Sequence, residues 1–179
     1  MAELGPLEQG GPSPLGEDMP CPVPREQRPL REYDQLCRSW FFAWPLHEGF
    51  PLVQALTISW LIAFPPSLLV ASGSLILRQN SAKMVLSAAV AALALPLLLL
   101  CRQWLGWTYV RKRLVSERVE YEESGWYDGQ VWEKPLTWRQ RDLLVASHQV
   151  APVLHRLRKS MAIGITLTVA GTCLCQALW

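Results

Sequence analysis

The sequence predicts a mainly α-helical, polytopic membrane protein with three transmembrane helices. Half of its 179 residues are hydrophobic, and its charged residues are unevenly distributed, since only Arg78, Lys83 and Arg102 fall between residues 50 and 110. Uncharged runs of this length are rare in soluble proteins and typical of helices that cross a bilayer. We also expect an interfacial amphipathic helix and a long inside loop that carries a short β-hairpin and a helix.

The first apolar run extends from Leu52 to Leu77 without a charged residue. At about 1.5 Å per residue it reaches roughly 39 Å, which exceeds the roughly 30 Å hydrocarbon core, so it can span a membrane with tilt. Pro65 and Pro66 remove two backbone donors from its middle. We expect them to kink the helix at a point where neighbouring helices can accommodate the defect.

The second apolar run, from Met84 to Cys101, is also long enough to span. Only residues 78–83 separate it from the first run, so the two should form an antiparallel helical hairpin. Trp104 and Trp107 follow the run and precede a cluster of basic residues at 111–113. This order is typical of an aromatic belt and a basic anchor at a membrane interface, to which we assign both tryptophans.

The third apolar run, from Met161 to Trp179, ends the sequence. Gly164 and Gly171 are seven residues apart and therefore share one helix face. Small residues on one face let a second helix approach closely. We interpret the two glycines as a packing signal.

The spans divide the chain into a disordered tail (1–20), an inside segment with the interfacial helix (21–51), a hairpin of two spans (52–101), a structured inside loop (102–160) and the third span (161–179). The second and fourth segments carry 15 Lys and Arg residues, and the connection between the first two spans carries two. Because positive loops stay inside, we expect the N-terminus inside and the C-terminus outside. The first 20 residues have no basic n-region or Arg-rich character, so we expect synthesis in the compartment where the protein works.

An amphipathic pattern precedes the first span, from Arg31 to Trp44. Apolar and aromatic residues recur there at helical spacing while charged and polar residues fill the rest of the circumference. We expect a helix that lies in the membrane interface and is ended by Pro45. Packing against the protein's own inside loop is the alternative. The interface residues of this stripe are Tyr33, Trp40, Phe41 and Trp44, accompanied by Leu36 and Cys37.

The inside loop contains the signals of a β-hairpin. Val119 and Tyr121 alternate with charged residues, and the turn dipeptide Asp128-Gly129 lies between Trp126-Tyr127 and Val131-Trp132. Aromatic residues exposed on a loop are common anchors of protein interfaces. We therefore predict that Trp126, Tyr127 and Trp132 bind a partner protein.

A helix should follow Pro135. Thr137 and Gln140 have the spacing of a capping box. Pro152 should bend this helix. The residues expected to line its apolar side are Leu143, Leu144, Ser147, Val150, Leu154 and Leu157.

No group of residues has the pattern of a catalytic centre, and we expect no enzymatic activity, no metal and no cofactor. Two alternatives stay open. Four carboxylates, Glu120, Glu122, Glu123 and Asp128, could hold a hard cation such as iron, although solvated charge around a hairpin explains them too. His148 and His155 could bind the metal of chlorophyll or haem, or they could be exposed polar positions on a helix. The nearly balanced charge argues against nucleic acid as a partner.

Two motifs resemble one family closely. They are the run CPVPREQRPLREY from Cys21 to Tyr33, continued by SWFFAWP, and the run EESGWYDGQVWEKP from Glu122 to Pro135. The resemblance is to a membrane-protein family catalogued as conserved in the green lineage and diatoms, and it covers about residues 21–157. It implies a photosynthetic organism, and a thylakoid or related membrane of a cyanobacterium or plastid with the charged side facing cytoplasm or stroma. It supplies no set of catalytic residues.

These observations favour a non-enzymatic assembly or auxiliary factor of a photosynthetic membrane complex such as a photosystem, with subunits of that complex and the lipid bilayer as partners. A pigment, haem or iron handling protein is the alternative from a second class. An enzyme acting on lipid or pigment is a third, and the absence of titratable groups within the spans argues against it.

Overall fold

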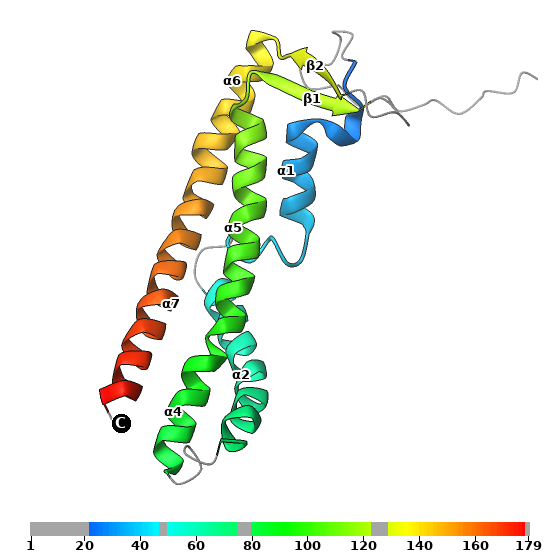
Figure 1. Cartoon of the computed structure of the whole chain (residues 1–179). Helices are drawn as coiled ribbons and strands as arrows, with labels where there is room; N and C mark the ends of the chain where they lie inside the picture. Colours follow the sequence, from blue (N-terminus) through cyan, green and yellow to red (C-terminus); the bar gives the residue numbers. More distant parts are fainter. Residues whose placement is uncertain (1–21, 47–49, 75–79, 123–128, 178–179) are drawn as a thin grey trace, which may run out of the picture.

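Long helices form most of the computed structural model, which describes residues 22–46, 50–74, 80–122 and 129–177. The chain enters through a 3₁₀ turn, η1 (Arg25–Gln27), and a helix, α1 (Pro29–Arg38). Figure 1 shows α1, the hairpin and α6 at one end of the molecule, and α2, α4 and the C-terminus toward the other. Three helices of the described chain are long and apolar enough to cross a membrane, as the sequence predicted.

The first two spans form the predicted antiparallel hairpin. Helix α2 (Phe50–Ser72) contains both Pro65 and Pro66 and packs along α4 (Ser81–Ala92). The indole N–H of Trp60 donates to the carbonyl of Ala89 at 3.1 Å and links the two helices. Asn80 begins α4 as its N-cap, because its side-chain oxygen accepts from two orphan amides of the first turn.

The second span continues well beyond Cys101. Helix α5 (Ala94–Val115) follows α4 after a single residue, Leu93, so that one rod of 35 residues runs from Ser81 to Val115. We call it the second rod, because it contains the second span. The predicted inside segment from Arg102 therefore begins as helix rather than as loop, and its bound at the membrane stays a prediction. Residues 102–115 have no helix breaker apart from Gly106, and helical propensity carries the span out of its apolar segment.

The third span also belongs to a longer rod. One continuous helix, which we call the third rod, consists of α6 (Leu136–Val145), a π-helical turn η2 (Ala146–Val150) and α7 (Ala151–Ala177). In the π turn the amide of Ala151 donates to the carbonyl of Ala146, five residues earlier. A π turn contains one more residue than an α turn, and this one closes at Ala151, directly before Pro152, which has no amide to donate. The additional residue rotates the faces of α6 relative to those of α7.

Gly164 and Gly171 place α7 against the second rod, as predicted. A Cβ added to Gly164 would lie 2.7 Å from Leu97 Cδ2, and one added to Gly171 would lie 2.5 Å from Val90 Cγ2. The helices run antiparallel, so the residue numbers of facing positions have a constant sum, which is 261 in both contacts. This register puts Lys159 at the level of Arg102.

The main core lies where α1, α5 and the π turn meet. Trp107 is its largest member and is fully buried. Its ring meets that of Tyr33 edge to face, with centroids 6.1 Å apart. The other buried residues of the cluster are Leu52, Leu100, Val110, Leu114, Ala146, Val150, Val153, Leu154 and Leu157.

A two-stranded antiparallel sheet joins the two rods. It consists of β1 (Arg118–Glu122) and β2 (Gly129–Glu133), with Val119 opposite Trp132 and Glu122 opposite Gly129. The predicted hairpin exists. Gly129, predicted as part of a turn dipeptide, pairs with Glu122 and begins β2, and Asp128 lies outside the described residues.

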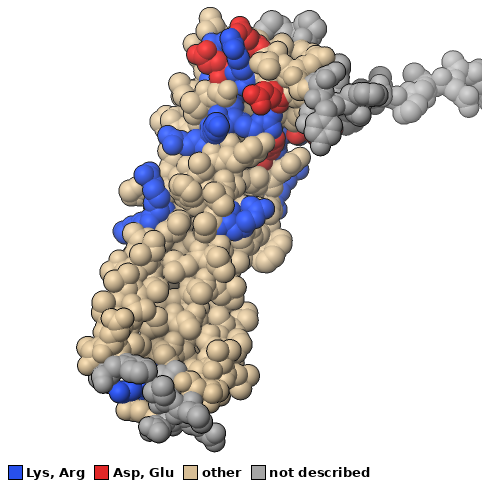
Figure 2. Space-filling view, viewed as in Figure 1, with Lys and Arg blue, Asp and Glu red and all other residues tan. Residues whose placement is uncertain are grey.

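Charge is segregated along the molecule. Figure 2 shows Lys, Arg, Asp and Glu over the end that carries the hairpin, and an uncharged surface over most of the other half. No carboxylate occurs from Asn80 to Ser116 or from Leu143 to Ala177, so the part of the charged end that adjoins the apolar half is purely basic on these two rods. This arrangement is typical of a membrane protein with its basic side inside.

Candidate functional site

The aromatic stripe of α1 packs on the protein. Tyr33, Leu36 and Cys37 are half-buried against the core, and the hydroxyl of Tyr33 donates to Gln149 Oε1 at 2.6 Å. The interfacial assignment is therefore wrong for Tyr33. It is also wrong for Trp107, because a ring buried in this core cannot face lipid headgroups. Apolar residues of α5 such as Trp107 offer this stripe a surface on which burial is favourable.

The helix also ends earlier than predicted. α1 stops at Arg38, and residues 40–46 form a turn-rich segment in which Trp40, Phe41 and Trp44 contact one another edge to face. The side chain of Trp40 is 77% exposed. We call residues 40–46 the aromatic segment. Trp40, Phe41 and Trp44 remain predicted interface residues, and so does the half-buried Trp104.

Three polar side chains from the long rods hold this segment. Gln103 Nε2 donates to the carbonyl of Phe41 at 2.7 Å, and Arg156 donates to the carbonyls of Pro45 and Leu46 at 3.0 and 3.2 Å. The guanidinium of Arg102 lies over the ring of Phe42, 5.3 Å from its centroid. The aromatic segment is therefore fixed at the depth where the apolar part of α5 ends.

A buried ion pair connects the hairpin to both rods. Lys134 Nζ lies 2.6 Å from Asp142 Oδ2 and also donates to the carbonyls of Arg113 and Leu114. A cation at the C-terminal carbonyls of α5 compensates the partial negative charge there. Burial raises the pKa of Asp142, and the hydrogen bond and charge of Lys134 oppose that rise. Lys134 and Asp142 belong to no sequence motif that predicts this pair.

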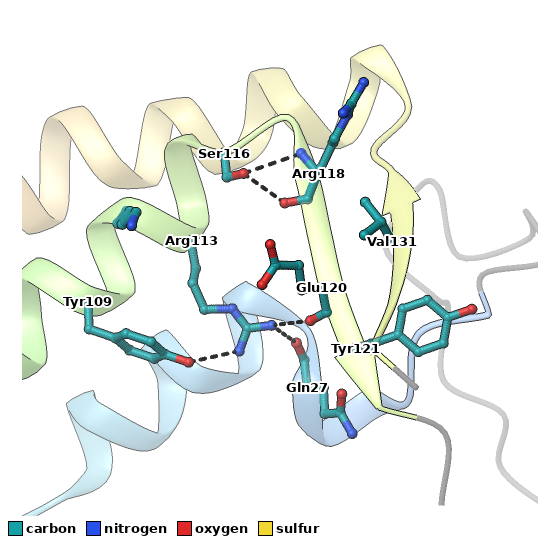
Figure 3. A pocket seen from close by; sticks show the side chains of 10 residues that line it. Gln27, Tyr109, Arg113, Ser116, Arg118, Glu120, Tyr121 and Val131 are labelled. Carbon is teal, nitrogen blue, oxygen red and sulfur yellow. Dashed lines mark hydrogen bonds between the residues drawn. The ribbon is translucent and has the colours of Figure 1, made fainter. Parts of the chain in front are cut away.

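Arg113 forms a second junction. It pairs with Glu32 of α1 and donates to Tyr109 Oη at 3.3 Å, to the carbonyl of Gln27 at 3.1 Å and to the carbonyl of Glu120 at 3.2 Å. Burial raises the pKa of Glu32, and the guanidinium of Arg113 opposes that rise. One side chain thus ties η1, α1, α5 and β1 together, as Figure 3 shows for three of these bonds.

An open cleft of about 730 Å³ lies beside this junction, between the end of α5, η1 and the hairpin. Lys112, Arg113 and Arg118 supply its positive charge, and Glu120 supplies a carboxylate. The hydroxyl of Ser116 donates to the carbonyl of Arg118 at 2.7 Å. The cleft can accept a polar or anionic group of a binding partner.

The structure describes one of the three predicted partner-binding residues. Trp126 and Tyr127 lie outside the described residues. Trp132 is half-buried, packs against Val119, and meets Trp138 edge to face with ring centroids 5.4 Å apart. The partner-binding role of all three stays a prediction, and Trp132 additionally supports the hairpin.

Helix α6 presents an unexpected apolar face. Leu136, Leu143 and Leu144 are 73%, 54% and 59% exposed, whereas Asp142 and Ala146 are buried. We call these three leucines the α6 face. The prediction that Leu143, Leu144 and Ser147 share a buried side with Val150, Leu154 and Leu157 is therefore wrong. The π turn lies between the two groups and turns the first away from the core.

The predicted capping box is also wrong. Pro135 occupies the N-cap of α6 and no side chain caps the helix, so Thr137 and Gln140 lie within the helix. Helix α6 begins at Leu136 because Pro135 fixes the backbone immediately before it.

The alternatives involving metals gain no geometric support. His148 and His155 are both exposed on the third rod. Glu120 and Glu122 both belong to β1, where alternate residues share one face. Glu123 and Asp128 lie outside the described residues. Within the described ranges, no three His, Cys, Asp or Glu residues are grouped as metal ligands would be.

Comparison with known proteins places this architecture in a family. The model of the CGLD27-like family, described as conserved in the green lineage and diatoms 27, matches residues 21–163. The chain belongs to this family. A CGLD27-like origin accounts for both sequence motifs, and the second of them ends with Lys134 of the buried ion pair and Pro135 of the α6 N-cap.

Similar proteins occur in algae and plants. The chain is 38% identical to a protein named ycf36 of Porphyra purpurea over 154 residues, which covers 84% of this chain and 91% of the relative. It is 35% identical to the ycf36 protein of Cyanophora paradoxa, with 84% and 94% covered. A longer Arabidopsis thaliana protein named for conservation in the green lineage and diatoms, and described as chloroplastic, is 36% identical over 78% of this chain and 43% of its own length. No solved structure matches.

Proposed function

We propose that this protein is a non-enzymatic assembly or auxiliary factor of a photosynthetic membrane complex, acting by protein contacts at its charged end. It resides in a thylakoid membrane, or in the plasma membrane of a cyanobacterium, with the N-terminus and hairpin on the cytoplasmic or stromal side. The chloroplastic description of the Arabidopsis relative supports the photosynthetic setting. The segregation of charge supports the orientation.

The α6 face carries the proposal. Leu144 precedes Lys159 by 15 residues, so it stands roughly 22 Å along the helix from the last cation before the apolar part of α7. This distance exceeds the thickness of a headgroup region, so lipid does not cover the leucines. Exposed apolar residues gathered on one face outside the bilayer are typical of a protein interaction site.

The anchoring of α6 supports a docking role rather than a flexible surface. Asp142 precedes Leu143 in the sequence but is buried on another side of α6, where Lys134 holds it. Lys134 itself binds two carbonyls at the end of α5. Trp138 on the same helix packs against Trp132 of the hairpin. Because these contacts fix α6 before any partner arrives, binding requires little ordering of the platform.

The test is a paired substitution on the α6 face. Leu143→Ser with Leu144→Ser should leave membrane abundance and thermal stability close to wild type, because both side chains are exposed. Co-purification of a photosynthetic complex or its assembly intermediate from mildly solubilised membranes should fall at least about tenfold, as expected when interface anchors are lost.

Two further variants serve as controls. Ser147→Ala changes an exposed residue near the same face without removing an apolar group and should leave co-purification unchanged. Val150→Ser changes a core residue and should reduce abundance and stability. Undiminished co-purification in the double leucine variant, or no photosynthetic complex with wild type, would contradict the proposed function.

A further inference from the structure

The boundary between the charged end and the apolar half is a second surface, distinct from the α6 face. Arg102 is exposed on α5, and Arg158 and Lys159 are exposed on α7. The sum of 261 for facing positions puts Lys159 level with Arg102 and Arg158 level with Gln103. The three cations therefore lie within one helical step of the same depth, and we call them the basic collar.

The depth of the basic collar coincides with one face of a bilayer. Lys83, at the start of α4, precedes Arg102 by 19 residues, which corresponds to about 28 Å of helix and to the thickness of a hydrocarbon core. Lys159 precedes the end of α7 at Ala177 by 18 residues, about 27 Å. On both rods the basic residues therefore border an uncharged length sufficient to cross a hydrocarbon core, so the collar meets the headgroups of one leaflet.

The surroundings of the collar favour an anionic ligand. The rods carry no carboxylate from Asn80 to Ser116 or from Leu143 to Ala177. The four salt bridges of the described residues lie elsewhere, at Arg113, Arg118, Lys134 and Arg139. These stretches of the two rods therefore supply no negative charge to complement the collar, and lipid headgroups at this depth can supply it.

The aromatic segment adds an apolar contact at the same level. Its Phe41 carbonyl is bound by Gln103, the neighbour of Arg102, and its Phe42 ring lies beneath the Arg102 guanidinium. Trp40, 77% exposed, can pack beside the glycerol region of a lipid, where indole rings are favoured. At this depth, the cations can bind an acidic lipid headgroup, and the aromatic rings can contact the glycerol backbone of the same lipid.

From this geometry we infer that the basic collar, with the aromatic segment, is a binding site for anionic glycerolipids of the inner leaflet. The ligand is an acidic headgroup presented by a membrane, such as that of phosphatidylglycerol. This inference is independent of the partner complex, since no residue of the collar belongs to the α6 face.

The experiment measures which lipids stay with the full-length protein. The protein is placed in nanodiscs of phosphatidylcholine with one fifth phosphatidylglycerol, extracted with mild detergent, and its retained lipids are quantified by mass spectrometry. Wild type should enrich phosphatidylglycerol. Replacing Arg158 and Lys159 by Gln should reduce the ratio of phosphatidylglycerol to phosphatidylcholine among the retained lipids, by about fivefold for each cation and about thirtyfold for both.

Matched variants decide whether the site or the total charge is responsible. Arg25→Gln with Arg31→Gln removes the same charge from exposed positions farther from the apolar half and should leave enrichment unchanged. Arg158→Lys with Lys159→Arg keeps the charge and should also retain it. Equal loss in the Arg25 and Arg31 variant, or full enrichment after Arg158 and Lys159 are both replaced, would overturn the inference.

A final arm separates lipid from free anion. Inorganic phosphate in large excess over the headgroup should not displace retained phosphatidylglycerol, because the glycerolipid also contacts the aromatic segment and the apolar half. Displacement by phosphate would overturn the assignment to a lipid. Trp40→Ala should lower the enrichment while the collar charge is intact, and an unchanged enrichment would remove the aromatic segment from the site.

Discussion

Lys134 Nζ and Asp142 Oδ2 lie 2.6 Å apart with both side chains buried. The ion pair joins the strand that ends the hairpin to the helix that begins the third rod. Through the carbonyls of Arg113 and Leu114, Lys134 also binds the end of the second rod. Three parts of the charged end thus depend on one ammonium group.

Breaking this pair from one side should destabilise the protein strongly. Lys134→Met leaves a buried carboxylate and Asp142→Leu leaves a buried ammonium, and each should cost about 3 to 5 kcal/mol of unfolding free energy. The double variant should lose less than the sum of the two. Thermal unfolding in detergent measures all three, and additive losses would show that the two groups do not interact.

The close approach of α7 to the second rod should depend on Gly171. An added Cβ at Gly171 would by itself lie 2.5 Å from Val90 Cγ2. The branched side chain of Gly171→Val therefore forces the helices to separate or repack, at a cost of about 1 to 3 kcal/mol. Ala170→Val, at the neighbouring exposed position, is the matched control and should be nearly neutral. Equal thermal stability of the two variants would argue against this packing.

The aromatic residues of the hairpin should divide into two groups. Trp132→Ala should lower thermal stability, since its ring packs on Val119 and Trp138. Trp126→Ala and Tyr127→Ala should leave stability close to wild type and reduce co-purification of the partner complex, as expected for binding anchors. If the latter two variants bind like wild type, docking by the hairpin is excluded and the α6 face acts alone.

Topology can be measured with thiol reagents, but native Cys37 is a poor probe of the inner side. Cys37 is half-buried, and burial raises the pKa of its thiol, so little reactive thiolate forms. Ser147→Cys supplies an exposed probe at the charged end, and native Cys173 is exposed near the other end.

The predicted topology gives opposite labelling at these two positions. In sealed vesicles with the outer face outward, an impermeant maleimide should label Cys173. The same reagent should miss the thiol introduced by Ser147→Cys until the membrane is opened. Labelling of that introduced thiol in intact vesicles would reverse the assigned orientation.

Much of the fold follows from the sequence because a membrane imposes a length on apolar runs. The three spans, the helical hairpin and the glycine contacts of α7 are predictable on this basis. The limits of the rods are not. The charges of residues 102–115 lower their hydropathy, which predicts a loop. These residues nevertheless continue α5, because Trp107 and Leu114 of the same segment pack in a core outside the bilayer.

The candidate site is less accessible to sequence reasoning. A stripe of leucines at helical spacing predicts burial, and the π turn that directs Leu143 and Leu144 outward has no local signature except the nearby Pro152. The pairing of Lys134 with Asp142 also depends on how the hairpin returns to α5, which neither residue reveals alone. The stripe on α1 is amphipathic, as its spacing predicts, but it packs on the protein core instead of lipid.

The most direct test of the docking account is photo-crosslinking from the α6 face in native membranes. A photoreactive phenylalanine analogue at position 143 should crosslink to a subunit of a photosynthetic complex or its assembly intermediate, while the same group at Ile165, exposed in the apolar part of α7, should capture lipid. Crosslinking of position 143 to lipid alone, or to no subunit of a photosynthetic complex, would contradict the account.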